Sequence, residues 1–301
     1  MKKVLATGSN GLLGQKLSDL YLHIPEVDFM ATARGKSRHP SKKLAYTEMD
    51  VTQEEQVEKV VASFQPDCII HAAAMTQVDD CEDNKALCDL LNVESVKFVS
   101  KAAQKLDAQL IHLSTDFIFD GQKGPYKETD QANPLSYYGH SKLRAEEYLQ
   151  KYGQNWSILR TVLVYGLVHD MSRSNIVLWA KNALSAKQYI KVVDDQFRTP
   201  TLAEDLAMGC RLAEKKKAQG IFNISGKDFM SIYELVERVA KAYNLDMENV
   251  ERISSTTLNQ KAKRPPKTGF DLSKAEKILG YQAKSFEEGI ALIEAQREAY
   301  S

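Results

Sequence analysis

One stretch near the N-terminus decides the fold: Lys3-Val4-Leu5-Ala6-Thr7-Gly8-Ser9-Asn10-Gly11-Leu12-Leu13-Gly14. Its apolar first half predicts a β-strand, and the glycines after it predict a tight turn that opens a helix. Such a turn lets the backbone approach a pyrophosphate, while the helix N-terminus supplies N–H donors. The spacing alone is weak evidence, because glycines cluster in any strand-to-helix turn. Its place directly after the first strand predicts a dinucleotide site formed by Gly8, Asn10, Gly11, Leu12 and Gly14.

The first half of the chain alternates short apolar runs with segments of helical period. We expect strands near Lys3–Ala6, Asp28–Ala33, Leu44–Met49, Asp67–Ala73, Gln109–Ser114 and Ser157–Val164. The segments Gln53–Phe64 and Ala86–Leu106 repeat apolar residues at three- and four-residue steps, as covering helices do. This order predicts an α/β fold with a doubly wound parallel sheet of the Rossmann type. Ligands of such a sheet bind beyond the carboxyl ends of its strands.

The regular alternation ends after about Leu167. The later chain mixes helix-like segments, such as Asn175–Ala186 and Ser231–Tyr243, with short strands and the basic, proline-bearing stretch Lys261–Lys267. We therefore predict a dinucleotide-binding domain over residues 1–167 and a smaller, mainly substrate-binding lobe over residues 168–301. Segments at about 190–225 are expected to return to the larger domain.

Composition excludes several classes of partner. Lys plus Arg and Asp plus Glu both total 40 in 301 residues, so no overall field attracts nucleic acid or an anionic membrane. No apolar run reaches the ~18 residues of a membrane span. The apolar run near the N-terminus is interrupted by the glycine turn too soon to form the apolar region of a signal peptide. The four cysteines form no C-x-x-C pair, and no metal-ligand cluster is visible. We expect a cytoplasmic protein that binds neither nucleic acid nor membrane.

The end of the second predicted strand bears on the choice of cofactor. An NAD site usually carries an acid there, whereas this strand ends Ala31-Thr32-Ala33-Arg34. Arg34, with Lys36 and Arg38 behind it, offers charge and paired donors to a ribose 2′-phosphate. The alternative is a solvated basic loop, since exposed Arg and Lys are common. We predict NADPH as the cofactor, with NADH as the alternative.

A tyrosine and a lysine share one face of a predicted helix. Asn133-Pro134 is typical of a helix start and Gly153 of a helix end, so Tyr138 and Lys142 project together. Tyr137, one position earlier, is rotated away. A neighbouring ammonium is expected to stabilise the Tyr138 phenolate and lower its pKa, which suits proton transfer.

A hydroxyl lies upstream of this pair. Thr115 directly follows the predicted strand Gln109–Ser114, at the sheet edge where a hydroxyl can bind a substrate carbonyl. Each signal is weak alone, because Y-x-x-x-K often arises by chance and a Ser-Thr pair at a strand end is often a turn. Thr115, Tyr138 and Lys142 are the predicted catalytic set.

The order of these features resembles the extended form of the short-chain dehydrogenase/reductase superfamily. This resemblance implies that Asp50 and Val51 lie at the adenine, and that Ala72, Ala73 and Ala74 lie beside the cofactor. It also implies that Asn92 supports the active site and that Thr115, Tyr138 and Lys142 are catalytic.

Finer motifs resemble the dTDP-4-dehydrorhamnose reductase branch, which reduces the 4-keto group of a dTDP-6-deoxy-hexose. These motifs are Thr76–Glu82, Ser114–Gly121, Asn133–Leu135, Asp195–Thr201 and Arg264-Pro265 leading to Phe270-Asp271. The resemblance implies a nucleotide-sugar substrate whose diphosphate contacts Arg264, although a solvated basic loop is an equal alternative there. Sugar-nucleotide dehydratases carry a glutamate where this chain has Phe117. The absence of this carboxylate in the present chain favours carbonyl reduction over elimination.

One position departs from that branch. The rhamnose reductases tend to carry a tryptophan that packs on the sugar, and the matching residue here is Leu163. A related branch, the regulatory β subunit of methionine adenosyltransferase, has an aliphatic residue there and is similar around Phe222–Gly226. A second hypothesis is therefore a dinucleotide-binding regulatory subunit with little catalysis of its own. A homodimer is compatible with either hypothesis.

Overall fold

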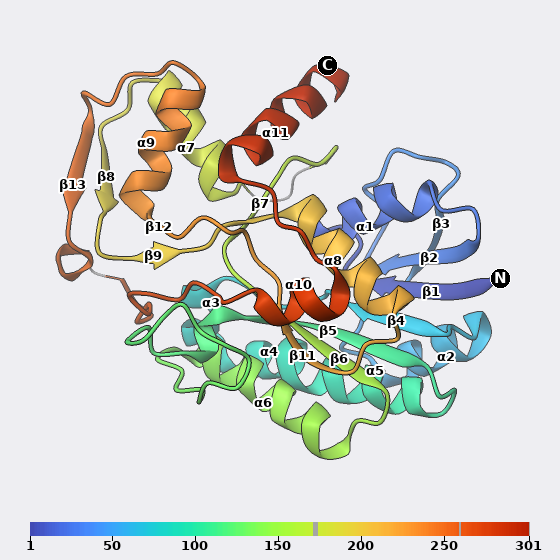
Figure 1. Ribbon diagram of the computed structural model, residues 1–301. Coiled ribbons are helices and arrows are strands. Elements are labelled where there is room, and N and C mark those ends of the chain that lie inside the picture. The colour runs from blue at the N-terminus through green and yellow to red at the C-terminus, as the bar shows by residue number, and fades with distance from the viewer. Residues whose placement is uncertain (171–173, 259, 301) are drawn as a thin grey trace.

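The centre of the molecule is a seven-stranded sheet in the order β11-β6-β5-β4-β1-β2-β3. We describe a computed structural model over residues 1–170, 174–258 and 260–300 (Figure 1). Every neighbouring pair in the sheet is parallel. The strands are β1 Lys2–Thr7, β2 Val27–Ala33, β3 Ala45–Glu48, β4 Cys68–His71, β5 Gln109–Thr115, β6 Trp156–Thr161 and β11 Gly220–Asn223. The predicted α/β fold with a doubly wound parallel sheet is confirmed.

Helices cover both faces of this sheet, because successive side chains of a strand point to opposite sides. On β1, Val4 and Ala6 join one buried cluster and Leu5 joins the other. The first face is covered by α1 Leu12–Leu22, α8 Ala203–Lys215 and α10 Ser273–Leu279. The second face is covered by α2 Glu54–Phe64, α5 Ser95–Gln104 and α6 Tyr137–Tyr152.

A third apolar cluster lies outside the sheet, in the later half of the chain. It is built from α7 Ile176–Ser185, α9 Ile232–Ala242, α11 Phe286–Tyr300 and the strand β8 Ile190–Val193. Strand β8 pairs in parallel with β13 Val250–Ile253. Figure 1 shows this lobe at the upper left, with the large sheet below it. Within residues 190–225, α8 and β11 lie on the large sheet and β8 lies in the lobe. The division at about residue 167 stays a prediction.

Short elements connect the two parts. Two small ladders pair β7 Val164–Tyr165 with β10 Thr201–Leu202 and β9 Phe197–Arg198 with β12 Met230–Ser231. The remaining helical segments are α3 Val78–Asp83, α4 Lys85–Asp89, a π-helical turn Leu90–Glu94, and the 3₁₀ turns Asp116–Ile118 and Ser255–Thr257. None of the helices in the described ranges is long and apolar enough to cross a bilayer.

The predicted strands of the large sheet are present, but the end of the last strand and the start of one helix differ from the prediction. The last predicted strand, Ser157–Val164, ends at Thr161, and Leu163 adopts a positive φ of 39° that turns the chain into β7. The predicted helix start at Asn133 is wrong. Helix α6 begins at Tyr137, and Ser136 caps it by accepting the Gly139 N–H at 3.2 Å. The Asn133 side chain instead donates to Asp120, while the predicted end at Gly153 is confirmed.

Candidate active site

The glycine loop lies between β1 and α1 and packs directly on the segment after β4. Gly8 has a φ of +70°, and a Cβ there would lie 2.7 Å from the backbone nitrogen of Ala73. A Cβ on Gly14 would collide with the carbonyl oxygen of Gly8 and with Ser9. Both positions therefore require glycine, for conformation at Gly8 and for space at Gly14.

Replacing Gly14 by alanine is expected to lower the free energy of unfolding by about 1–3 kcal/mol, the usual cost of forcing a methyl group into a packed site. Gly11→Ala is the matched control, because a Cβ added there would lie 3.3 Å from its nearest neighbour and the φ of Gly11 is −84°. Denaturant unfolding of the two variants checks this. Equal stability losses would show that Gly14 is not sterically constrained.

The side chain of Asn10 ties the glycine loop to the segment after β2. Its Nδ2 donates to the carbonyl oxygens of Arg34, at 3.4 Å, and Lys36, at 2.9 Å, and its Oδ1 accepts the Arg38 N–H at 2.9 Å. Arg34 is exposed at the end of β2. The structure therefore brings the predicted phosphate loop and the predicted 2′-phosphate ligand together.

The local chemistry of this loop fits a dinucleotide. Helix α1 begins at Leu12 after the cap residue Gly11, which has no side chain that could bond the first turn. The backbone N–H groups of the helix N-terminus are therefore available to a ligand. Ser9 Oγ is buried and has no hydrogen-bond partner within the described residues. A buried hydroxyl without a partner is costly unless a ligand satisfies it. These features are compatible with a bound pyrophosphate.

The other predicted cofactor residues lie at the ends of β3 and β4. Asp50 accepts hydrogen bonds from the Thr52 N–H, at 2.9 Å, and hydroxyl, at 2.7 Å, so its carboxylate caps a turn. Val51 is buried in the apolar cluster that contains Met49 and Val57. After β4, the Ala73 N–H donates to the Thr7 hydroxyl at 3.2 Å. Ala72, Ala73 and Ala74 are all half-buried beside the glycine loop.

Thr115 and Tyr138 meet at the carboxyl end of β5. Thr115 Oγ1 accepts the Phe117 N–H at 3.2 Å and donates to Asp116 Oδ1 at 3.1 Å. Tyr138, on α6, is 8% exposed, and the Phe117 ring contacts it edge-on at 5.8 Å between centroids. Burial raises the pKa of Tyr138 above its ordinary value, and the adjacent Thr115 hydroxyl opposes this in part. Tyr138 is thus a protonated hydroxyl at neutral pH.

Lys142 lies one helical turn further along α6 and is also buried. Its Nζ donates to the carbonyl oxygen of Leu113 at 2.6 Å and lies 3.3 Å from Nε2 of His112. Burial lowers the pKa of Lys142 to about 8, although the Glu146 carboxylate acts in the other direction. The pKa of Tyr138 is raised on balance, because burial is the largest effect on it, so the expected net lowering of this pKa is not present in this structure.

Asn92 supports helix α6, as the family resemblance implied. Its amide donates to the Ser141 hydroxyl at 3.0 Å and exchanges hydrogen bonds with the Met75 backbone. Ser141 directly precedes Lys142, so this contact fixes the lysine relative to the segment after β4. Asn92 lies in the π-helical turn Leu90–Glu94, a kind of distortion often found at functional sites.

A buried ion pair behind Thr115 was not predicted. The Asp116 carboxylate accepts a hydrogen bond from the Thr268 hydroxyl and lies 3.8 Å from Nε of Arg198. The Arg198 guanidinium also packs over the Phe117 ring at 5.7 Å. Asp116, Arg198 and Thr268 are each at most 4% exposed. These three residues hold the start of the segment that carries Phe117 in place. They lie far apart in the sequence, so their contact could not be predicted from spacing.

The structure places Arg264 against an acidic side chain of α3. Its guanidinium forms a paired contact with the Asp79 carboxylate, at 2.6 and 3.3 Å. Burial lowers the pKa of Arg198, the Asp116 carboxylate opposes this, and the charge of Arg264 adds a smaller lowering. Arg264 would therefore have to release Asp79 before it could bind a diphosphate.

A second buried ion pair holds α6 on the sheet. Arg160, on β6, donates to the Glu146 carboxylate at 2.7 and 3.1 Å, and the Ser114 hydroxyl donates to the same carboxylate at 2.5 Å. Glu146 is fully buried and Arg160 is 4% exposed. Since Glu146 follows Lys142 by one turn, this network positions the helix that carries both candidate catalytic residues.

Comparison with known proteins decides the family. The model of the family described as RmlD substrate binding domain matches residues 1–298. The chain belongs to this family. A dTDP-4-dehydrorhamnose reductase of Aggregatibacter actinomycetemcomitans is 31% identical, over 99% of this chain and all of that protein. The methionine adenosyltransferase 2 subunit beta of Danio rerio is 30% identical, over 94% of this chain and 87% of that protein. Both branches of the predicted resemblance are confirmed as relatives.

Solved structures agree with membership in the RmlD family. A dTDP-4-dehydrorhamnose reductase from Bacillus anthracis, in complex with NADP, superposes with a TM-score of 0.86 at 28% identity, covering 98% of this chain and all of that one. A UDP-glucose 4-epimerase from Thermotoga maritima superposes with a TM-score of 0.87 at 22% identity, which shows the shared fold alone. The extended short-chain dehydrogenase/reductase fold is confirmed.

Proposed function

We propose that the chain is an NADPH-dependent reductase of the 4-keto group of a nucleotide-linked 6-deoxy sugar, with dTDP-4-dehydrorhamnose as the first substrate to test. The observation that carries the proposal is that Thr115 and Tyr138 meet at the carboxyl end of β5, the edge of the sheet that also holds the glycine loop. Lys142, one helical turn after Tyr138, donates to the Leu113 carbonyl of the same strand. A full-length relative with that activity in its name, at 31% identity, supports it.

In this proposal each residue has one role. The dinucleotide, when bound, supplies the hydride for the carbonyl carbon. The Tyr138 hydroxyl, which burial keeps protonated, gives its proton to the carbonyl oxygen, and the Thr115 hydroxyl binds that same oxygen. Lys142 is protonated below about pH 8, so its charge stabilises the phenolate that Tyr138 becomes.

Phe117 supports reduction over dehydration. Its ring packs against Tyr138 at 5.8 Å, in the place where the sequence comparison expects a dehydratase to carry a glutamate. An apolar ring cannot remove a proton from the sugar ring, so elimination lacks its base. Arg264 is the proposed diphosphate contact, and it would exchange its pairing with Asp79 for the substrate.

The direct test is to mix the purified protein, NADPH and dTDP-4-dehydrorhamnose and follow the absorbance of the reduced nicotinamide. We expect oxidation of NADPH that depends on the keto sugar. Related nucleotide-linked 4-keto sugars form the comparison set, because Leu163 leaves the sugar specificity open. If none of them drives oxidation, the proposed function is wrong.

Arg34→Ala is expected to weaken NADPH binding about 10- to 150-fold, which corresponds to the ~1.5–3 kcal/mol of a lost charge-assisted contact. NADH binding is expected to change little, because NADH has no 2′-phosphate. Titration of both cofactors by nicotinamide fluorescence measures this. Arg252→Ala, an exposed arginine paired with Asp194 in the smaller lobe, is the control. Equal losses for NADPH and NADH would assign Arg34 a structural role.

A second candidate function is favoured by Leu163 and by the regulatory relatives. Leu163 packs against both the sheet cluster and the lobe cluster, at the junction of the two parts of the molecule. The methionine adenosyltransferase subunits at 30% identity belong to the same family. A regulatory subunit should form a stoichiometric complex with a purified methionine adenosyltransferase catalytic subunit on size exclusion. Separate elution together with keto-sugar reduction would reject this candidate.

A cytoplasmic location belongs to the same proposal. The four cysteines are buried free thiols, as expected in a reducing compartment.

A homodimer stays a prediction, and light scattering of the purified protein tests it.

A further inference from the structure

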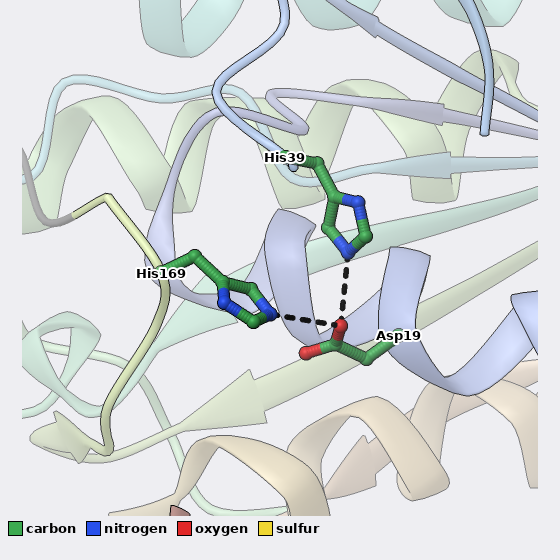
Figure 2. A group of neighbouring side chains, drawn as sticks. All are labelled: Asp19, His39 and His169. Atoms are coloured by element: carbon green, nitrogen blue, oxygen red, sulfur yellow. Dashed lines mark hydrogen bonds and ion pairs between the residues drawn. The ribbon is translucent and has the colours of Figure 1, made fainter. Parts of the chain in front are cut away.

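Two histidines converge on one aspartate at the edge of the proposed cofactor site (Figure 2). Nε2 of His39 lies 2.9 Å from Asp19 Oδ1, and Nε2 of His169 lies 3.8 Å from the same oxygen. One potential ligand atom from each residue lies within 4.8 Å of the others. The three residues come from separate segments, namely helix α1, the segment between β2 and β3, and the segment after β7.

The donor set has the chemistry of a transition-metal site. Two imidazole nitrogens and one carboxylate oxygen are ligands preferred by Zn²⁺ and by Co²⁺ and Ni²⁺, with water completing the shell. Bonds of about 2 Å at a tetrahedral centre place ligand atoms roughly 3–3.5 Å apart. The two Asp19–His distances of 2.9 and 3.8 Å bracket this spacing, and the ligand nitrogens of the two histidines lie within 4.8 Å of each other. Small side-chain rotations would therefore suffice to hold one ion.

The charges around the cluster are compatible with a cation. Lys16 lies 3.8 Å from the other oxygen of Asp19, but Glu204 binds the same ammonium at 2.9 Å. Arg38 faces Asp170 at 4.0 Å. The charges of Glu204 and Asp170 balance those of Lys16 and Arg38. The Asp19 carboxylate then gives the cluster a net negative charge, which favours a bound cation.

Each histidine must also offer a lone pair to the ion. Nδ1 of His39 accepts the Ser41 N–H at 3.2 Å, so its Nε2 now carries a proton toward Asp19. If Nε2 bound the metal, the proton would move to Nδ1. Nδ1 could then no longer accept the hydrogen bond from the Ser41 N–H, so one neutral hydrogen bond would be lost.

We propose that Asp19, His39 and His169 bind one divalent transition-metal ion of the zinc class. Such an ion would join helix α1 to the segment that carries Arg34 and to the chain leaving β7 toward the smaller lobe. The proposal does not depend on the reductase activity, because binding is measured without substrate or cofactor.

The test uses the full-length protein, freed of metal with a chelator. Zn²⁺ is titrated in competition with a chromophoric chelator, and Co²⁺ binding is followed by its visible absorption. His169→Ala is the main variant, because His169 is exposed and its loss does not threaten the fold. His23→Ala is the matched control, since His23 is exposed one turn from Asp19 and its ring bonds the backbone oxygen of Asp19 rather than the carboxylate.

We expect one Zn²⁺ per chain, an affinity at least tenfold weaker in His169→Ala, and no change in His23→Ala. The Co²⁺ spectrum should lack a thiolate charge-transfer band, which separates this site from the buried cysteines. The proposal is overturned if the wild-type protein takes no metal from the chelator, or if His169→Ala weakens binding less than tenfold. A thiolate band would also overturn it.

Discussion

Tyr138→Phe is expected to lower kcat for keto-sugar reduction by about 100- to 10,000-fold, the range typical of a lost general acid. The phenyl ring preserves the packing of Tyr138 against Phe117 and the buried Cys81 and Cys88, so the fold should be unchanged. The affinity for NADPH should stay within about twofold, because the hydroxyl is not part of the predicted cofactor contacts. Steady-state kinetics and a cofactor titration measure the two quantities.

The neighbouring tyrosine provides the matched control. Tyr137 directly precedes Tyr138 on α6, and its hydroxyl donates to Asp89 at 2.8 Å. Tyr137→Phe should keep nearly full activity. If Tyr138→Phe retained more than about a tenth of the wild-type kcat, another group would have to donate the proton.

Glu146→Gln is expected to lower the free energy of unfolding by about 3–5 kcal/mol, because it leaves the Arg160 guanidinium buried without its countercharge. Both side chains are almost fully buried, so water cannot replace the lost carboxylate. The variant should also lose activity, since Glu146 holds the helix that carries Tyr138 and Lys142. Denaturant unfolding measures the stability.

Two comparisons sharpen this result. Glu147→Gln, at the exposed neighbouring position of α6, should change stability by less than about 0.5 kcal/mol. Replacing both partners by apolar residues, as in Glu146→Leu with Arg160→Met, should recover part of the loss, because no unpaired charge remains. A Glu146→Gln variant as stable as Glu147→Gln would contradict the assigned role of the pair.

The sheet and the glycine loop were predictable because their signals are local. The apolar run before Gly8 and the glycines after it lie within a few residues of each other, and the structure places them at β1 and the start of α1. The shared face of Tyr138 and Lys142 followed from helical spacing in the same way. The start of α6 was misplaced because Asn133-Pro134 matches a local capping pattern, whereas Asn133 bonds Asp120.

The parts that could not be predicted depend on contacts between distant segments. Asp116, Arg198 and Thr268 form their buried cluster from three separate parts of the chain. The direction of the pKa shift of Tyr138 depends on how deeply the fold buries it, which spacing along a helix does not report. The ligand set Asp19, His39 and His169 likewise has no sequence spacing typical of a metal site.

The central claim is that hydride passes from NADPH to a sugar carbonyl in this site. The most direct measurement uses NADPH with deuterium at the transferable position of nicotinamide C4, incubated with the protein and dTDP-4-dehydrorhamnose, and analyses the sugar by mass spectrometry and NMR. We predict one deuterium at C4 of the product sugar, and at most about a hundredth as much labelled product with Tyr138→Phe over the same short incubation. A sugar that stays unreduced and free of deuterium with the wild-type protein would contradict the claim.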